Sequence, residues 1–155
     1  MRRQLLGTAA LAMLLLGCSG DGTTREEDGT ITGAGEVSVD AVQEGDCVDI
    51  PASSEVSEFT GIPCDEAHDA QVYALFEVPG DDFPGDAEVT SQGETGCASR
   101  FEAFVGMSYE ESIYYINTVR PTELSWERGD REVICLIAPE DGSPKLTQDL
   151  AGIGE

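Results

Sequence analysis

The stretch Arg131-Glu132-Val133-Ile134-Cys135-Leu136-Ile137-Ala138 (REVICLIA) decides the fold, because apolar residues occupy both faces of any strand it forms. A strand that is apolar on both faces is buried on both sides, which indicates a central position in a sheet. Residues 71–78 (QVYALFEV) alternate apolar and other side chains, which is the period of a second strand. The domain is therefore predicted to be built around a sheet.

Shorter elements surround these two strands. Residues 45–50, 58–64 and 112–118 are predicted as further strands. Residues 88–105 are predicted as the main helix, because Phe101 and Phe104 follow Cys97 at offsets of four and seven. A short helical turn is expected at 123–128. The fold class is α+β: a small, mostly antiparallel sheet with one main helix packed on it.

Composition excludes several classes of partner. The 155 residues contain 31 Asp and Glu but only 8 Lys and Arg, so the formal net charge is −23. Nucleic acid is not expected as a partner, because binding phosphate needs clustered basic residues. Electrostatic docking on anionic lipid is excluded for the same reason. Apolar residues at 40% allow a small core.

The N-terminus resembles an export signal. Arg2 and Arg3 precede an uncharged run rich in Leu and Ala, which ends Leu15-Leu16-Gly17-Cys18. That junction matches the bacterial lipobox, so residues 1–17 are predicted to be cleaved and Cys18 to be acylated. The protein would then be lipid-anchored on the outer face of the cell membrane. The alternatives are an ordinary signal peptide with an incidental cysteine, or a buried apolar helix.

Residues 18–43 are predicted to be the lipidated cysteine and a disordered acidic tether. Gly, Thr, Asp and Glu dominate this segment, and large apolar side chains are scarce. Such a segment buries too little surface to offset its ordering entropy. The folded domain is therefore expected to span residues 44–155.

Four cysteines remain in that domain, and an even number in an exported chain predicts two disulfides. Their wide spacing argues against a zinc site, which usually brings two ligands close together in sequence. Three connectivities are possible. We expect Cys47–Cys64 between two short strands, and Cys97–Cys135 between the main helix and the central strand.

His68, the only histidine, precedes Asp69 and gives a possible functional turn. A general base oriented by the aspartate is one interpretation. A histidine in a turn between strands, bonded to local backbone, is the simpler one. The loop at residues 80–86 looks like a calcium loop but lacks its order of ligands, so it is predicted to be a solvated turn and no metal site is expected. No cofactor is expected either. Trp126 and the tyrosines are expected in the core or half-buried, with a glycan-stacking patch as the alternative.

An ordered set of short motifs resembles a known family. The set begins with Gly45-Asp46-Cys47, continues through Cys64, His68-Asp69 and Cys97, and ends with Trp126, Gly129-Asp130-Arg131 and Cys135. This order is similar to that of the actinobacterial septum-formation domain family. The resemblance covers residues 44–153. It implies a role near the division septum and brings no catalytic residue or cofactor with it.

Two functions follow as hypotheses. The first is a membrane-tethered, non-enzymatic interaction module of the cell envelope, whose partner is an unknown envelope protein or wall component. The second is an envelope hydrolase that acts on wall polymer through Asp or Glu residues and His68. A concave pocket that converges on His68 and two carboxylates would favour the hydrolase.

Overall fold

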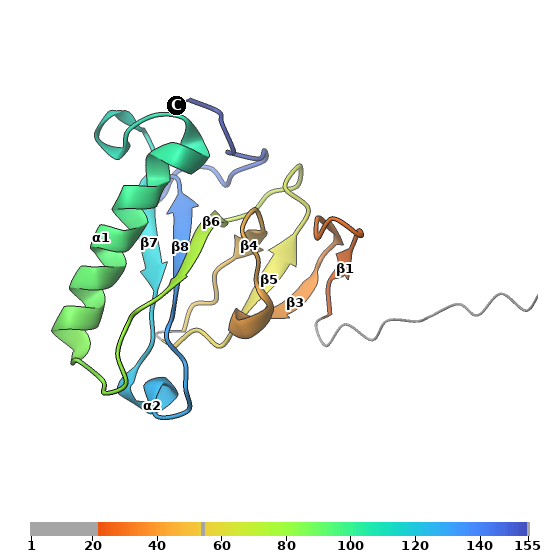
Figure 1. Cartoon of the computed structure of the whole chain (residues 1–155). Helices are drawn as coiled ribbons and strands as arrows, with labels where there is room; N and C mark the ends of the chain where they lie inside the picture. The colour runs from red at the N-terminus through yellow and green to blue at the C-terminus, as the bar shows by residue number, and fades with distance from the viewer. Residues whose placement is uncertain (1–21, 54, 155) are drawn as a thin grey trace, which may run out of the picture.

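The computed structural model describes residues 22–53 and 55–154. They form an α+β domain, as expected from the sequence (Figure 1). The helical elements are η1 (Val39–Ala41), α1 (Asp86–Val105), η2 (Tyr109–Glu111) and α2 (Glu123–Trp126). The strands are β1 (Thr24–Arg25), β2 (Ile31–Gly33), β3 (Gly35–Ser38), β4 (Cys47–Asp49), β5 (Glu58–Ile62), β6 (Ala70–Glu77), β7 (Tyr115–Val119) and β8 (Glu132–Ala138).

Six strands form one antiparallel sheet in the order β3-β5-β4-β6-β8-β7, and β1 and β2 form a separate hairpin. The two strands predicted most clearly, β6 and β8, are neighbours, with Gln71 opposite Ile137 and Glu77 opposite Glu132. The strand β8 also pairs with β7, and its residues from Val133 to Ala138 are all buried. The interpretation of residues 131–138 as a central strand is therefore confirmed.

One face of the sheet is covered by α1 (Figure 1). The buried residues of this helix recur every four positions, at Val89, Gly93, Cys97, Phe101 and Val105. This spacing forms a single stripe on the helix that packs against β6 and β8. The helix ends where Gly106 adopts a left-handed conformation with φ 88° and donates its N–H to Glu102.

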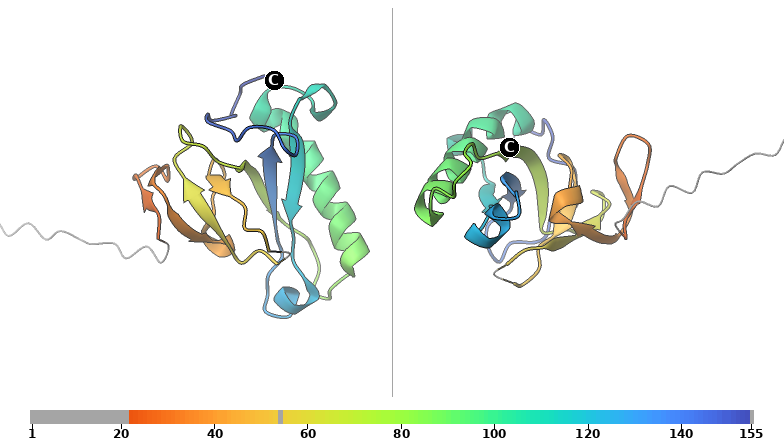
Figure 2. Two further views of the ribbon diagram at one scale, coloured as in Figure 1. Left: turned by 180° about the vertical axis from the view of Figure 1, so that it is seen from behind. Right: turned by 60° about the horizontal axis from the view of Figure 1, so that its bottom comes forward.

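The opposite face of the sheet encloses a second core. Val37 and Phe59, from β3 and β5, pack in one cluster with Ile134 and Leu136 from β8. No described helix is needed to bring them together, because the sheet itself curves, as Figure 2 shows from below and behind. This curvature leaves an opening at the end of the sheet where α2 lies.

Both predicted disulfides are present. Cys47–Cys64, the first disulfide, links β4 to the residues after β5, and its Cα atoms are 5.2 Å apart. Cys97–Cys135, the second disulfide, joins α1 to β8 inside the core, with the Cα atoms 5.4 Å apart. The second disulfide forms because the apolar stripe of the helix lies on the face of the sheet to which Cys135 points.

The expected tether is wrong for the described part of residues 18–43. This segment contains β1, β2 and β3, and β3 is an edge strand of the main sheet. Ile31, Val37 and Val42 are all buried. The polar composition of the whole segment gave no sign that these three apolar side chains would be buried, because each packs against residues from other parts of the fold. The fold therefore reaches back at least to residue 22 and does not begin at residue 44.

Candidate functional site

His68 is fully buried, and every contact that it makes is structural. Its backbone forms a two-way bridge to Leu146, with N···O distances of 3.0 and 2.9 Å. Its Nδ1 lies 2.8 Å from the carbonyl oxygen of Glu66, an acceptor, so this nitrogen carries the proton. Nε2 is buried and has no hydrogen-bond partner within the described residues. A substrate cannot reach this imidazole in the folded domain.

Asp69 does not orient the histidine. One of its carboxylate oxygens accepts a hydrogen bond from the N–H of Ile50 at 3.1 Å, and the other lies 3.1 Å from the ammonium of Lys145. The same ammonium lies 2.7 Å from Asp49, and these hydrogen bonds raise the pKa of Lys145. The two residues of the possible functional turn thus hold different parts of the fold and form no catalytic pair.

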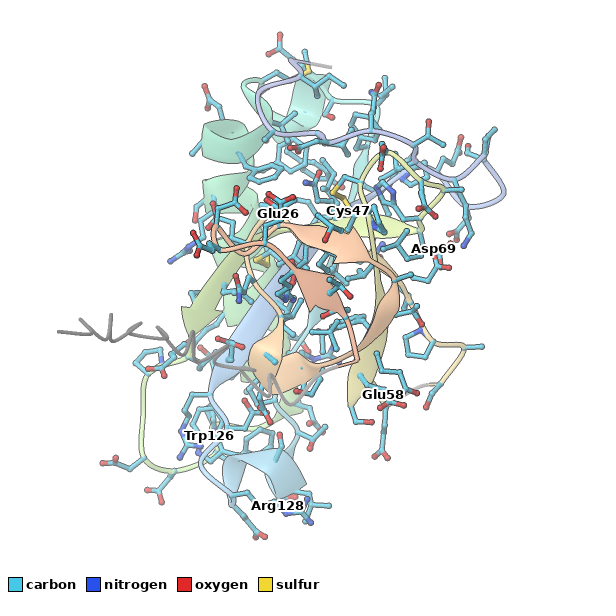
Figure 3. The ribbon with its side chains drawn as sticks, turned by 90° about the vertical axis from the view of Figure 1, so that its right-hand side faces the viewer. Glu26, Cys47, Glu58, Asp69, Trp126 and Arg128 are labelled. Carbon is cyan, nitrogen blue, oxygen red and sulfur yellow. A yellow bond between two sulfur atoms is a disulfide. The ribbon has the colours of Figure 1, made fainter. Side chains whose placement is uncertain are left out.

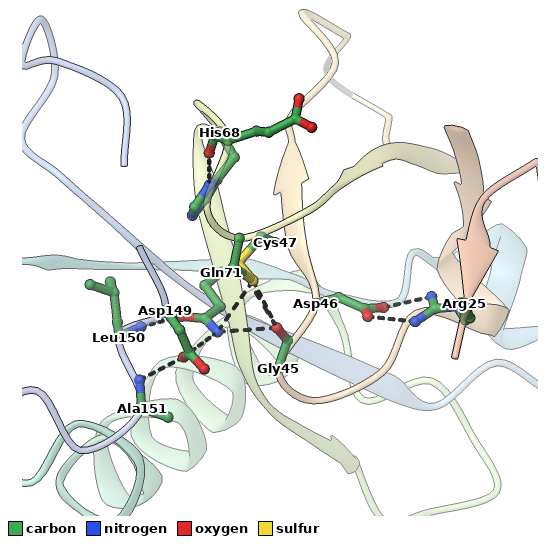
Figure 4. The surroundings of a disulfide bond; sticks show 11 residues. Arg25, Gly45, Asp46, Cys47, His68, Gln71, Asp149, Leu150 and Ala151 are labelled. Atoms are coloured by element: carbon green, nitrogen blue, oxygen red, sulfur yellow. Dashed lines mark hydrogen bonds and ion pairs between the residues drawn. A yellow bond between two sulfur atoms is a disulfide. The ribbon is translucent and has the colours of Figure 1, made fainter. Parts of the chain in front are cut away.

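Gln71 is buried beside the first disulfide and fastens the C-terminal segment (Figure 4). Its Nε2 donates to the carbonyl of Gly45 at 3.1 Å and to Asp149 Oδ1 at 2.8 Å. Its Oε1 accepts from the N–H of Leu150 at 2.8 Å. This amide side chain therefore helps to hold the end of the chain over the sheet, together with the backbone bridge between His68 and Leu146.

Trp126 is a core residue and is not part of an exposed aromatic patch. The guanidinium of Arg131 lies 3.8 Å above the centre of its indole ring, and Phe83 packs against the ring edge-on. The indole N–H donates to the carbonyl of Asp81 at 3.0 Å, and Arg131 donates to the same carbonyl. These contacts fix the loop at residues 80–86 and the short helix α2 against the end of the sheet.

A groove lies beside α2, at the open end of the curved sheet. Figure 3 shows this end of the molecule with Trp126 and Arg128. Residues 118–134 form one wall of the groove, and η1 with residues 55–57 forms another. Its volume is about 760 Å³, within the range of small-ligand sites. Its apolar lining consists of Val39, Val56, Val119, Pro121, Leu124 and Ile134.

Two exposed arginines, Arg120 and Arg128, line this groove. Each of the other four cationic side chains in the described part of the chain has partners: Arg25 binds Asp46, Arg100 stacks on Phe76, Arg131 stacks on Trp126, and Lys145 binds two carboxylates. The side chain of neither groove arginine forms a salt bridge, hydrogen bond or ring contact with another described residue. The free positive charge of this acidic domain is thus concentrated in the groove.

Carboxylates also line the groove. Glu132 is half-buried, and burial raises the pKa of its side chain. The negative charges of Asp130, Asp40 and Glu77 raise this pKa further. Three of these four carboxylates, Asp40, Asp130 and Glu132, belong to the groove lining. The groove therefore combines two unpaired cations, an apolar floor and mutually repelling anions.

The groove arginines were not predicted as site residues, because neither stands in a motif or a local pattern that indicates a binding site. The only signal in the sequence is that basic residues are scarce, with 8 Lys and Arg against 31 Asp and Glu, so each arginine is a candidate for a specific role. Arg120 and Arg128 flank the segment that begins at Pro121 and includes Trp126. Only the folded chain shows that the other cations are already paired.

Some predictions lie outside the described residues. The signal peptide at residues 1–17 and the acylated Cys18 both do, so the anchor stays a prediction. Within the described ranges, no group of three or more His, Cys, Asp or Glu side chains is arranged to hold a metal ion. The same ranges contain no helix with the length and hydropathy that crossing a bilayer requires.

A family model described as septum formation matches residues 15–135 of the chain. The match starts well before residue 44, in agreement with the folded strands β1 to β3. It ends at Cys135, the second cysteine of the helix–sheet disulfide. No curated protein and no solved structure matches this sequence.

Proposed function

This chain belongs to the septum-formation family, and from that premise we propose that it is a lipid-anchored binding module of the cell envelope. The groove beside α2 is its binding site, and the ligand is a component of the septum or the cell wall. Binding, without chemical conversion of the ligand, is the molecular activity.

The observation that carries this proposal is the pair of unpartnered arginines in the groove. A guanidinium ion usually finds a carboxylate, and this domain has many carboxylates on its surface. Arg120 and Arg128 instead stand over an apolar floor that includes Val119 and Ile134. An anionic group of a ligand would pair with both guanidinium groups at once, and the apolar parts of the same ligand would pack on the floor of the groove.

The chemistry around the groove supports binding over catalysis. The imidazole of His68 is buried elsewhere and bonded to Glu66. The hydroxyl groups of Thr122 and Ser125, which line the groove, are engaged in the capping box at the start of α2. These groups stabilise the groove wall, and neither hydroxyl is paired with a base.

The anchor would place the domain close to the bilayer. Four peptide units join Cys18 to Gly22, the first described residue, so their Cα atoms are separated by at most about 14 Å. The β1–β2 hairpin starts at once after this point. An acylated Cys18 would thus hold the folded domain close to the membrane.

The proposal is tested by complementation in cells that lack the native chain. The double variant Arg120→Gln/Arg128→Gln should reach the membrane at normal levels, measured by immunoblot of the membrane fraction, yet fail to restore septum formation. The matched control Arg100→Gln, on α1, should restore it. Cys18→Ala should fail because the protein leaves the membrane. Full complementation by the groove double variant would contradict the proposal.

The hydrolase remains a second candidate because of Glu132. A carboxyl with a raised pKa beside another carboxylate is a pattern found in general acids. The measurement is the release of soluble fragments from purified cell walls. Release that is abolished by Glu132→Gln, but not by His68→Gln, would favour a groove hydrolase that does not use the histidine.

A further inference from the structure

We propose that the groove recognises a wall peptide that carries both a free carboxylate and a free ammonium group. The peptide carboxylate would lie between Arg120 and Arg128, and its ammonium group would lie against the carboxylates of Asp130 and Glu132. This inference rests on the proposed function, because it takes the wall as the source of the ligand.

The anionic half of the ligand follows from the two arginines. They come from opposite ends of α2, since Arg120 follows β7 and Arg128 follows the helix. Guanidinium groups bind carboxylates through two parallel hydrogen bonds, which fixes the orientation of the ligand as well as its charge. Both side chains are available, because neither has a described partner to leave.

The cationic half follows from the acidic side of the same groove. Glu132 projects from the face of β8 that also carries Ile134, next to Asp130 and near Asp40. Their mutual repulsion disfavours the fully ionised set in the free protein. An ammonium group would relieve that repulsion, so the gain on binding would exceed that of an ordinary surface ion pair.

Other occupants complement only part of the groove. A simple cation would satisfy Glu132 and leave both arginines unpaired. A phosphate-rich polymer would meet the arginines but would be repelled by Asp40, Asp130 and Glu132. A neutral glycan would use neither set of charges. A peptide with both charged groups and small apolar side chains complements the cations, the anions and the apolar floor together.

The experiment measures the affinity of the acylated mature protein, in mild detergent, for a fluorescent synthetic peptide. The peptide is L-Ala–D-isoglutamine–L-Lys–D-Ala–D-Ala, labelled at its N-terminus so that the lysine amine is its only free amine and the terminal carboxylate its only free carboxylate. Two matched peptides carry a C-terminal amide or an acetylated lysine. We expect each neutralised peptide to bind about tenfold more weakly or worse, because a charge-assisted contact is lost.

Protein variants show which side chains bind each charged group of the peptide. Arg120→Gln/Arg128→Gln should weaken the unmodified peptide by about the same factor as amidation, and should not weaken the amidated peptide further. Asp130→Asn/Glu132→Gln should behave in the same way toward the acetylated peptide. Arg100→Gln and Glu94→Gln, which are exposed on α1, should leave all affinities unchanged. Thermal melting confirms that each variant is folded before its affinity is compared.

Several outcomes would overturn the inference. One is the absence of saturable binding, and another is equal affinity for all three peptides. A third is a loss of affinity for the amidated peptide in the arginine double variant that equals the sum of the two separate losses. Binding of a phosphate polymer or a simple cation alone would also overturn it. If the peptides do not bind but the arginine variant still fails to complement, the groove has another ligand and the proposed function stands. If the arginine variant complements, the proposed function itself fails.

Discussion

Arg25 binds both carboxylate oxygens of Asp46, with N···O distances of 2.6 and 2.8 Å, in a nearly buried pair. Asp46 also accepts a hydrogen bond from the N–H of Gln43 at 2.7 Å. The pair joins the β1–β2 hairpin to the loop before β4, next to the first disulfide (Figure 4). The acidic N-terminal segment is therefore part of the domain.

Asp46→Asn should destabilise the domain by about 3 kcal/mol, because it removes the nearly buried carboxylate charge that both terminal guanidinium nitrogens of Arg25 contact. The check is urea unfolding followed by circular dichroism. Glu27→Gln, which removes an exposed carboxylate from the same hairpin, is the control and should change stability little. An unchanged unfolding midpoint for Asp46→Asn would mean that the hairpin adds nothing to the fold.

The two glycines of α1 should respond in opposite ways to substitution by alanine. A methyl group at Gly93 would meet Val133 at 3.7 Å, an ordinary contact, whereas one at Gly96 would overlap the Phe76 ring at 2.2 Å. Gly93→Ala should therefore stabilise the domain by about 0.5–1 kcal/mol through helix propensity. Gly96→Ala should destabilise it by about 1–3 kcal/mol through overpacking. The measurement is the melting temperature of both variants under the same conditions. A higher melting temperature for Gly96→Ala than for the wild type would contradict the close packing of Gly96 against Phe76.

Gln71→Met should loosen the C-terminal segment without detaching it, because backbone hydrogen bonds from Leu146, Gly152 and Gly154 remain. The substitution keeps the side-chain volume but leaves the N–H of Leu150 and the carbonyl of Gly45 without their partner. Buried groups left unpaired cost about 1–3 kcal/mol each. Hydrogen exchange should become faster at Leu146 and at residues 150–154 while β8 stays protected. Uniform protection across both regions would show that Gln71 does not hold the segment.

Glu132→Gln should raise stability at neutral pH, by at most about 1 kcal/mol. Because the pKa of Glu132 is raised in the folded state, the folded protein binds this proton more tightly than the unfolded chain, and ionisation works against folding. The wild type should thus gain stability from this site as the pH falls through the raised pKa. The advantage of the variant should disappear below the ordinary glutamate value of 4.5. A variant less stable than wild type at pH 7 would contradict this electrostatic picture.

The sequence predicted the elements that are held by strong local patterns. The strand β6 was predicted from alternation, α1 from helical spacing and β8 from a continuous apolar run, and tertiary contacts reinforce each pattern. The disulfide pairing followed from the same faces, because Cys97 lies on the buried stripe of the helix and Cys135 on the buried face of β8. The strand predicted from Ser112 begins only at Tyr115, since the 3-10 turn η2 precedes it.

The N-terminal strands and the groove could not be predicted in this way. Ile31 and Val37 are isolated apolar residues in the sequence, and they are buried only because they pack against β5. Local composition therefore indicated disorder. The groove depends on how the sheet curves and on which cations are already paired, and neither property has a local sequence signature. For His68 the error would run the other way. The residue type suggested a general base, but the side chain is fully buried and its contacts are structural.

Photo-crosslinking in living cells tests whether the groove beside α2 holds the ligand. A photoreactive residue replaces Leu124, which is exposed and lines the groove, or Thr95, which is exposed on α1. We expect a covalent adduct with wall material from position 124, which is lost in the Arg120→Gln/Arg128→Gln background, and no adduct from position 95. Adducts from position 95 alone, or adducts from position 124 that persist without the arginines, would contradict this expectation.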